Sequence, residues 1–269
     1  MPQAKINGVE LFWQEVGGGE DVLLLLHGFP LDHTMWRPQI DFFAALGWRV
    51  IAPDQRGYGQ SRHNPAEDTT MALLAQDAAA LLDHLGVARA VVMGLSMGGY
   101  VSFAFYRQFP ARVRALILAN TKAEPDAPLA RENRYKLREA VRSQGSAAAR
   151  DVMLPMMFSP ELHQSGGAML DELETVMLRT PPTAIISTLP GLAERPDSVP
   201  LLAGIEVPVL VIHGEKDQLM PVANARLMAQ AAPQARFVGV PDAGHMANIE
   251  NSEFFNRAVA EFLAEVKSR

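Results

Sequence analysis

The sequence predicts an α/β protein built on a mostly parallel sheet with helices on both faces. Two observations predict this class: short apolar runs alternate with helical periodicity along most of the chain, and 48% of the 269 residues are hydrophobic. Apolar runs of this kind are typical of parallel strands that helices bury on both sides. With only 20% charged residues, the chain is too apolar to be disordered. We expect one globular domain with an insertion.

The first segments of the chain predict an antiparallel hairpin at one edge of the sheet. Ala4–Ile6 and Val9–Gln14 are strand-like and are separated by Asn7-Gly8, a dipeptide typical of tight hairpin turns. Apolar residues at helical spacing over Thr69–Leu85 predict a helix that crosses between two parallel strands. The strands of the central sheet are expected at Val22–Leu26, Arg49–Ala52, Ala90–Met93, Ala115–Leu118 and Val209–Ile212.

The alternation of strands and helices stops over Thr121–Pro190, which we interpret as an insertion. Residues 1–120 and 191–269 are then expected to form the α/β core. Within the insertion, the sequence pattern predicts helices at Leu129–Arg142 and Met169–Leu178.

Composition and charge exclude several functional classes. The net charge of −6 would repel a phosphate backbone, so nucleic acid is not expected as a partner. The absence of cysteine excludes disulfides, thiolate nucleophiles and cysteine-based metal sites. The longest uncharged stretch, Ala90–Tyr106, contains three glycines and two serines and falls short of the ~20 apolar residues that span a bilayer. Because no secretory signal is visible, we expect a soluble, cytoplasmic protein without a membrane partner.

The segment Gly94-Leu95-Ser96-Met97-Gly98 carries the clearest chemical signal. It follows an expected strand and precedes a helix-like segment. A serine on such a sharp strand-to-helix turn takes strained backbone angles, and side chains two positions away on either side would collide. This context predicts that Ser96 is a nucleophile.

Serine is a poor nucleophile at neutral pH and needs a base that an acid holds in the correct tautomer. His245 lies in a short glycine-containing loop after the strand-like Arg236–Val240, near the end of the chain. Of the other histidines, His84 lies near the end of an expected helix and His163 lies in the insertion. We therefore predict His245 as the base.

The acid is expected at the carboxyl end of a strand, where open α/β sheets place their sites. Asp217 follows the fifth expected central strand and gives the chain order serine, acid, histidine. A rival position after the preceding strand holds Asn120, with Glu124 and Asp126 further along. Asp217 is the better placed of these acids.

A tetrahedral intermediate also needs hydrogen-bond donors for its oxyanion. The turn at Ser96 places the amide of Met97 as the first donor, and the second donor is expected from the loop His27-Gly28-Phe29-Pro30. Because Gly28 permits close backbone approach, we assign the amide of Phe29 to this role. His27 is interpreted as a structural brace of the loop.

The expected substrate pocket is mainly apolar and needs no metal. Flexible methionines of the insertion suit irregular apolar pockets, and other apolar residues neighbour the predicted catalytic positions in sequence. The predicted pocket residues are Trp36, Met153, Met157, Phe158, Leu219 and Met246.

Several motifs together resemble the α/β-hydrolase superfamily: His27-Gly28-Phe29-Pro30, Asp54 to Ser61, Gly94 to Gly99, His213 to Asp217 and Gly244-His245. Within it, the chain resembles small bacterial carboxylesterases, enol-lactone hydrolases and their cofactor-free perhydrolase relatives. The resemblance implies an α/β-hydrolase fold in which residues 121–190 form a helical lid. The serine at position 96 separates the chain from haloalkane dehalogenases and epoxide hydrolases, which attack with aspartate.

These features predict a serine hydrolase that cleaves carboxylic esters or lactones through an acyl-enzyme, with a small-molecule substrate and no cofactor. The same three catalytic residues would also serve perhydrolysis, thioester hydrolysis or carbon–carbon bond hydrolysis, which peroxide dependence and product analysis separate. A ligand-binding protein on the same scaffold is a further alternative, and it predicts tight binding with turnover near zero.

Overall fold

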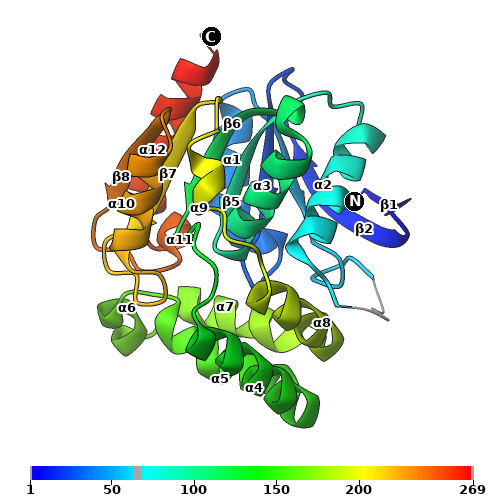
Figure 1. Cartoon of the computed structure of the whole chain (residues 1–269), viewed down its shortest axis with the longest axis vertical. Coiled ribbons are helices and arrows are strands. Elements are labelled where there is room, and N and C mark those ends of the chain that lie inside the picture. The colour runs from blue at the N-terminus through cyan, green and yellow to red at the C-terminus, as the bar shows by residue number, and fades with distance from the viewer. Residues whose placement is uncertain (1, 63–67, 268–269) are drawn as a thin grey trace.

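The computed structural model describes residues 2–62 and 68–267, and its centre is one eight-stranded sheet (Figure 1). The strands lie in the order β1-β2-β4-β3-β5-β6-β7-β8. Their bounds are β1 (Gln3–Ile6), β2 (Val9–Val16), β3 (Val22–Leu26), β4 (Arg49–Pro53), β5 (Ala90–Leu95), β6 (Val113–Ala119), β7 (Val209–Gly214) and β8 (Ala235–Val240). The predicted α/β class with a mostly parallel sheet is confirmed.

The first two strands form an antiparallel edge of the sheet. β1 pairs with β2 so that Ile6 lies opposite Val9. Asn7 and Gly8 form the turn with φ of 47° and 82°, a backbone that asparagine and glycine tolerate best. β2 also pairs antiparallel with β4, whereas the pairs from β4 to β8 are parallel. The hairpin predicted from Asn-Gly is therefore present.

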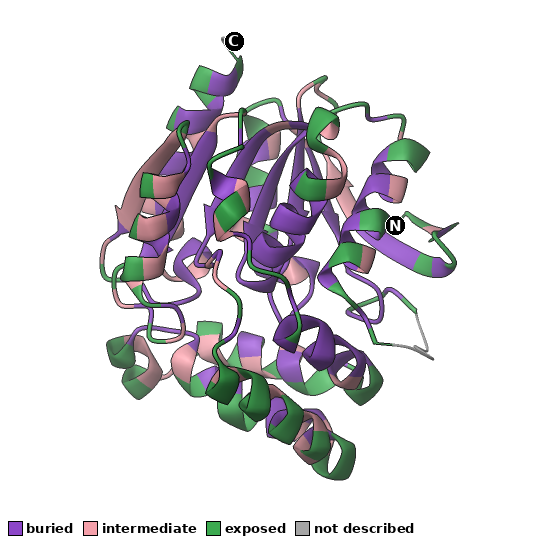
Figure 2. Cartoon of the chain, in the orientation of Figure 1, coloured by how far each residue is buried: buried purple, intermediate pink, exposed green. Residues whose placement is uncertain are grey.

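Helices cover both faces of the sheet and bury its central strands (Figures 1 and 2). α2 and α3 pack together on one face, and α1 packs against α12 on the other. Every residue of β3, β5 and β7 is buried, as their continuous apolar sequences predict. The helices of the core are α1 (Arg37–Ala45), α2 (Met71–His84), α3 (Met97–Gln108), α10 (Val222–Ala231) and α12 (Ser252–Lys267).

A group of helices between β6 and β7 stacks beyond the carboxyl ends of the parallel strands, at the lower end of Figure 1. We call them the inserted helices. α4 packs against α5 and α8, and α5 also packs against α7. They are α4 (Pro128–Gln144), α5 (Ser146–Met153), α6 (Pro160–Ser165), α7 (Ala168–Arg179) and α8 (Pro182–Ala193).

The last inserted helix does not stop at Pro190, where the sequence pattern suggested that the insertion ends. α8 contains Pro190 and continues to Ala193. The core holds this stretch closely, because Thr69 N donates to Ser187 O at 2.8 Å and a Cβ on Gly191 would lie 2.1 Å from Thr69 O. Packing thus overrides the helix-breaking tendency of proline.

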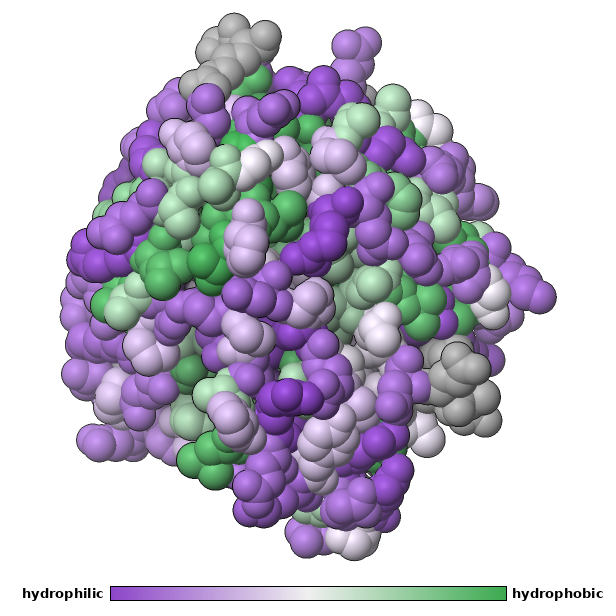
Figure 3. Space-filling model, in the orientation of Figure 1, coloured by the Kyte–Doolittle hydropathy of each residue, from purple (hydrophilic) through white to green (hydrophobic). Residues whose placement is uncertain are grey.

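Figure 3 shows mainly hydrophilic residues over the inserted helices at the lower end of the view. In the described part of the chain, none of the helices combines the length and the apolar character needed to cross a membrane.

Shorter elements connect these layers. They are η1 (His33–Trp36), η2 (Pro110–Arg112), η3 (Leu154–Met156), α9 (Val199–Leu202) and α11 (Ala247–Glu250).

Candidate active site

Ser96 occupies a strained turn between β5 and α3, with φ of 55° and ψ of −114°. A positive φ is uncommon for a residue with a side chain and stores strain. A Cβ on Gly94 would lie 2.1 Å from Gly98 O, and a Cβ on Gly98 would lie 2.0 Å from Leu26 O. Only glycine fits at both positions, because any side chain would overlap the backbone.

The turn is fixed to the end of β6. Ser96 N donates to Ala119 O at 3.0 Å, and Thr121 Oγ1 donates to Ser96 O at 2.8 Å. A Cβ on Gly99 would lie 2.5 Å from Thr121 Cγ2, so glycine lets α3 begin directly against this segment. These contacts hold Ser96 at the carboxyl edge of the sheet.

His245 lies in the loop between β8 and α11 and is buried. Its Nδ1 lies 2.8 Å from Asp217 Oδ2. An ionised carboxylate only accepts, so this hydrogen bond places the ring proton on Nδ1 and leaves the Nε2 lone pair free. Nε2 is buried and has no hydrogen-bond partner among the residues that the structure describes, so the Ser96 hydroxyl does not donate to it here. Such bonds often form only when substrate binds.

Asp217 follows β7 and is held by donors on every side. Its Oδ1 accepts from the amides of Leu219 and Met220, both at 2.9 Å. Its Oδ2 accepts from His245 and, at 2.9 Å, from Asn120 Nδ2. Burial raises the pKa of Asp217, but the electrostatic interactions with His245 and His213 and the hydrogen bonds from His245 and Asn120 outweigh it and hold the pKa below its usual value. The carboxylate is therefore kept ionised.

Asn120 is the residue at the rival acid position, and it acts as a donor to Asp217. Its Nδ2 also donates to Gly244 O at 3.1 Å, so it joins the end of β6 to the loop that carries His245. Asn120 has a φ of 43°, which asparagine tolerates better than most residues. The sequence showed an amide at this position but not the residue that it contacts.

The other two rival acids are engaged elsewhere. Glu124 accepts from Asn224 Nδ2 at 2.8 Å. Asp126 forms ion pairs with Arg134 and Arg195, both at 2.8 Å. Neither is a hydrogen-bond partner of the His245 ring in the described part of the chain.

A second histidine lies beside the Asp217 carboxylate and was not singled out from the sequence. His213 is the penultimate residue of β7, and its Nε2 donates to Met220 O at 2.7 Å and lies 3.4 Å from Asp217 Oδ2. Burial lowers the pKa of His213, so the ring is neutral at pH 7. It tightens the turn that presents Asp217.

The loop after β3 passes against the Ser96 turn. A Cβ on Gly28 would lie 3.6 Å from Ser96 Cβ, which shows how closely the two backbones approach. Phe29 and Met97 line one cavity with Ser96. Met97 is the first residue of α3, and the amides of the first turn of a helix have no partner within that helix. Both predicted oxyanion donors thus belong to residues beside the serine.

His27 braces this loop through both ring nitrogens. Its Nδ1 lies 2.9 Å from Gly28 O, and its Nε2 accepts from Gln55 N at 2.9 Å. Gln55 Nε2 in turn donates to His27 O at 2.8 Å. Burial lowers the pKa of His27, so the ring remains neutral in this arrangement.

The cavity at Ser96, which we call the Ser96 cavity, is small and mostly apolar, with a volume of about 40 Å³. Of the predicted pocket residues, Met153 and Leu219 line it. The others are buried in the surrounding core and do not line it, namely Trp36, Met157, Phe158 and Met246. The remaining lining residues are Phe29, Ser96, Met97, Tyr100, Arg134, Leu192 and Met220.

Arg134 is the cationic residue among those that line the Ser96 cavity. It extends from α4, and its Nε donates to Asp126 Oδ2 at 2.8 Å. Its neighbour in the cavity wall, Tyr100, is covered on its ring by Arg195 at 4.0 Å. The helical spacing of arginines on α4 gave no sign that one of them faces a cavity.

One buried group of possible metal ligands lies outside this site. The ligand atoms of Asp32, His33 and Asp54 lie within 4.8 Å of one another. Asp54 Oδ1 accepts from both His33 N and His33 Nδ1, and Asp32 Oδ2 accepts from Arg179 Nη2 at 2.5 Å. Because protein donors already occupy these oxygens, the group is a hydrogen-bonded network that holds the loop after β4.

The arrangement of strand ends, glycine turn and buried histidine–aspartate pair matches a known family. A family model described as the alpha/beta hydrolase fold matches residues 21–151 and 167–252. The chain belongs to this family.

Solved hydrolases of the family are similar over almost the entire chain. A thermophilic esterase from Thermogutta terrifontis is 38% identical over 99% of both chains, with a TM-score of 0.95. The enol-lactonase from Burkholderia xenovorans LB400 is 32% identical over 98% of this chain and 100% of that chain, with a TM-score of 0.91. A curated relative, 3-oxoadipate enol-lactonase 2 of Acinetobacter baylyi, is 31% identical over 84% of this chain and 82% of its own length. The predicted resemblance to bacterial esterases and enol-lactone hydrolases is confirmed.

In this alpha/beta hydrolase, the loop of His245 is attached directly to the inserted segment. Met246 N donates to Met157 O at 2.8 Å. The Glu250 carboxylate accepts from Gly244 N at 2.7 Å, from Ser159 N at 3.1 Å and from the Ser159 hydroxyl. Sequence reasoning missed Glu250, because nothing in its local pattern shows that it joins two distant segments.

Proposed function

We propose that this protein is a serine hydrolase that cleaves carboxylic esters or lactones through an acyl-enzyme intermediate. The observation that carries the proposal is the buried hydrogen bond of 2.8 Å between His245 Nδ1 and Asp217 Oδ2, at the sheet edge where the glycine turn presents Ser96. A neutral imidazole with a free Nε2 is the base that a serine nucleophile requires. The family's hydrolases support this reaction class.

In the first step, His245 Nε2 takes the proton of Ser96 Oγ as the oxygen attacks the substrate carbonyl carbon. The carbonyl π electrons move to oxygen, and the amides of Phe29 and Met97 stabilise the resulting oxyanion. Asp217 stabilises the imidazolium without taking its proton. The tetrahedral intermediate then collapses, the bond to the leaving oxygen breaks, and His245 donates its proton to that oxygen.

In the second step, water replaces the alcohol. His245 takes a proton from the water as its oxygen attacks the acyl carbon of the Ser96 ester. Collapse of the second tetrahedral intermediate breaks the bond to Ser96 Oγ, which regains its proton from His245. The carboxylic acid is released and the resting state is restored.

The cavity indicates a small acyl group that carries a negative charge. A volume of about 40 Å³ favours short acyl chains. Arg134 offers a cation in the otherwise mostly apolar wall, and a guanidinium suits a carboxylate. The thermophilic esterase, which was solved with malate bound, supports this preference. We therefore propose small esters or lactones that bear a free carboxylate as substrates.

We further propose that the inserted segment, predicted as residues 121–190 and extended here to Ala193 at the end of α8, acts as a lid on the core formed by residues 1–120 and the residues that follow Ala193. Met153, Arg134 and Leu192 belong to inserted helices and line the Ser96 cavity. The lid thus supplies part of the acyl-binding wall, while the core supplies the reacting groups.

A fluorophosphonate probe tests the nucleophile directly. We expect a covalent adduct on the peptide that contains Ser96, found by peptide mass spectrometry, and no adduct in Ser96→Ala or His245→Ala. Ser102→Ala is the matched control, because Ser102 is a buried serine of α3, the helix that follows Ser96, and its hydroxyl donates to Gly98 O at 2.8 Å. An adduct that persists in Ser96→Ala would overturn the proposal.

Substrate assays separate the other reactions open to the same residues. Short aryl esters and lactones are incubated with the enzyme with and without peroxide, and the products are identified. Peracid formation would assign a perhydrolase, and preference for thioesters or for carbon–carbon cleavage would assign those activities instead. Tight ligand binding without turnover of any of these compounds would favour a receptor-like role.

A further inference from the structure

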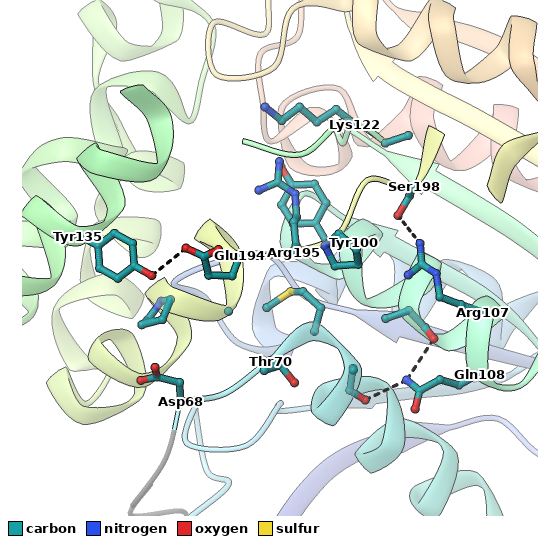
Figure 4. A pocket seen from close by; sticks show the side chains of 17 residues that line it. Asp68, Thr70, Tyr100, Arg107, Gln108, Lys122, Tyr135, Glu194, Arg195 and Ser198 are labelled. Carbon is teal, nitrogen blue, oxygen red and sulfur yellow. Dashed lines mark hydrogen bonds between the residues drawn. The ribbon is translucent and has the colours of Figure 1, made fainter. Parts of the chain in front are cut away.

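A second and larger cleft lies between the core and the inserted helices (Figure 4). Its volume of about 400 Å³ is in the range of small-molecule sites. It borders both segments that join the inserted helices to the core, since Lys122 and Ala123 line it from one and Arg195, Pro196 and Ser198 from the other. We call it the connector cleft. Tyr100 lines both this cleft and the Ser96 cavity.

The acidic side chains of the connector cleft are neutralised by cations outside its lining. Asp68 accepts from Arg138 Nη2 at 2.6 Å. Glu194 is paired with Arg131 and also accepts from Tyr135 Oη at 3.0 Å. In Figure 4 Asp68 lies apart from the labelled cations, whereas Glu194 lies beside Arg195. They therefore contribute little negative charge to the interior of the cleft.

The cations of the cleft, in contrast, are in excess over the acids that face them. Arg107 Nη2 donates to two neutral acceptors, Ser198 Oγ at 3.1 Å and Asp197 O at 3.4 Å, and it has no carboxylate partner in the described part of the chain. Lys122 and Arg195 share the single carboxylate of Asp126, at 3.5 Å and 2.8 Å.

Asp126 is also the partner of Arg134, so one buried carboxylate faces three cations. The group carries a net positive charge in a partly buried place, where an uncompensated charge is costly. Burial and the neighbouring Arg195 lower the pKa of Lys122, as an excess of positive charge requires. An anion bound in the connector cleft would reduce this excess of positive charge.

Much of the remaining lining is apolar and suits an apolar body. Met71 belongs to it, and alanines and prolines complete much of the wall. A few polar groups in a mostly apolar cleft are typical of sites for amphipathic small molecules.

We propose that the connector cleft binds a small carboxylate with an apolar body, at a site separate from the Ser96 cavity. The carboxylate contacts Arg107, and the apolar body packs on Met71. The site does not require that Ser96 react, so it can be tested independently of the catalytic proposal.

The test is an NMR titration of protein with isotope-labelled methionine methyl groups, using phenylacetate as the probe. Met71 lines the connector cleft and Met153 lines the Ser96 cavity, so their methyl signals report the two places separately. We expect saturable shifts of the Met71 signal, assigned with Met71→Leu, and little change at Met153. A saturable shift at Met153 without one at Met71 would overturn the proposal.

Charge dependence is tested with matched ligands and variants. Because hydrogen bonds to charged groups contribute about 1.5–3 kcal/mol, Arg107→Gln should weaken phenylacetate binding roughly tenfold or more. Lys122→Gln removes a positive charge of the lining and should weaken binding less. Lys136→Gln, an exposed lysine of α4 outside the lining, should leave binding unchanged. The uncharged phenylacetamide should bind far more weakly than phenylacetate. Equal binding of the two probes, or no loss in either cleft variant, would contradict a carboxylate site.

Discussion

Asn120 connects the predicted acid to the loop of the predicted base, and this makes it a sensitive position. Its side-chain amide donates to Asp217 Oδ2 at 2.9 Å and to Gly244 O at 3.1 Å. An amide at this position stabilises the Asp217 carboxylate without competing with it for the proton of His245. The role of the residue therefore depends on its being neutral.

Asn120→Asp should shift the acid limb of the activity profile. The new carboxylate keeps the shape of asparagine but replaces a donor with a like charge, so one proton is shared and the pKa of the pair rises. We expect the acid limb of kcat/KM for a short aryl ester to move to higher pH, with lower activity at neutral pH. Asn224→Asp, which changes an asparagine bonded to Glu124, is the control. An unmoved acid limb would show that Asn120 does not tune Asp217.

Tyr100 separates the Ser96 cavity from the connector cleft, which predicts a change in acyl-length preference when its ring is removed. In Tyr100→Ala we expect the ratio of kcat/KM for the octanoate over the acetate ester to rise about tenfold or more, since each buried methylene contributes ~0.8 kcal/mol. Leu219→Ala enlarges the Ser96 cavity without opening the connector cleft. It should raise kcat/KM only for esters whose acyl chain is slightly longer than acetate. Equal profiles for the two variants would contradict this role of Tyr100.

At the residue scale, local patterns predicted which candidate catalytic residues lie at the carboxyl edge of the sheet, but not their surroundings. The glycine turn, the late histidine loop and the acid after β7 are recognised from short stretches of sequence. Arg134, Tyr100 and Glu250 gain their contacts only when distant segments pack together. Trp36 and Met246 neighbour functional residues in sequence, yet both are buried away from the Ser96 cavity.

At the scale of elements, the inserted segment and the His245 loop are joined through one carboxylate. Glu250 at the end of α11 accepts from Gly244 N and from Ser159, which precedes α6. A Cβ on Gly244 would lie 2.4 Å from Ser159 N, so the two backbones are in close contact. Movement of the inserted segment and the position of His245 are thus coupled.

Glu250→Gln should loosen this junction. The amide nitrogen of glutamine cannot accept from the donors that face Glu250, so kcat for a short aryl ester should fall roughly tenfold, in line with the 1.5–3 kcal/mol of charged hydrogen bonds. Hydrogen exchange should become faster in peptides that span Ser159 and Gly244. Glu253→Gln, an exposed glutamate of α12, is the control. Unchanged exchange at both segments would contradict the coupling.

Element prediction succeeded where periodicity was strong and failed where packing decides. The hairpin, the central strands and the long helices α2, α4 and α7 follow from apolar spacing. α5 and α6 are too short to show a clear period, and α8 contains a proline that favoured a boundary. Contacts with Thr69 and its neighbours keep α8 helical in spite of this residue.

At the scale of the whole molecule, buried neutral histidines make stability depend on pH. Burial lowers the pKa values of His27 and His213 below the ordinary value of 6.5. The unfolded chain therefore binds protons that the folded chain does not bind as the pH falls below that value. Their contribution to stability is complete above it and is lost progressively at lower pH.

We expect the free energy of unfolding to fall between about pH 7 and pH 5, by up to roughly 1.4 kcal/mol per pH unit for each histidine. Urea unfolding across this range measures the slope. His27→Gln should reduce the slope, whereas His84→Gln, which changes an exposed histidine at the end of α2, should not. A free energy of unfolding that is constant over this range would contradict the assignment of neutral buried rings.

The two segments that connect the inserted helices to the core lie side by side, since Ser198 N donates to Ala123 O at 2.9 Å. The chain therefore leaves the sheet and returns to it at one place. A segment of different length or sequence could replace the inserted helices at this place without changing the order of the strands in the sheet. Evolution, or a protein engineer, can thus exchange the inserted helices, the proposed source of substrate preference, while the core is inherited unchanged.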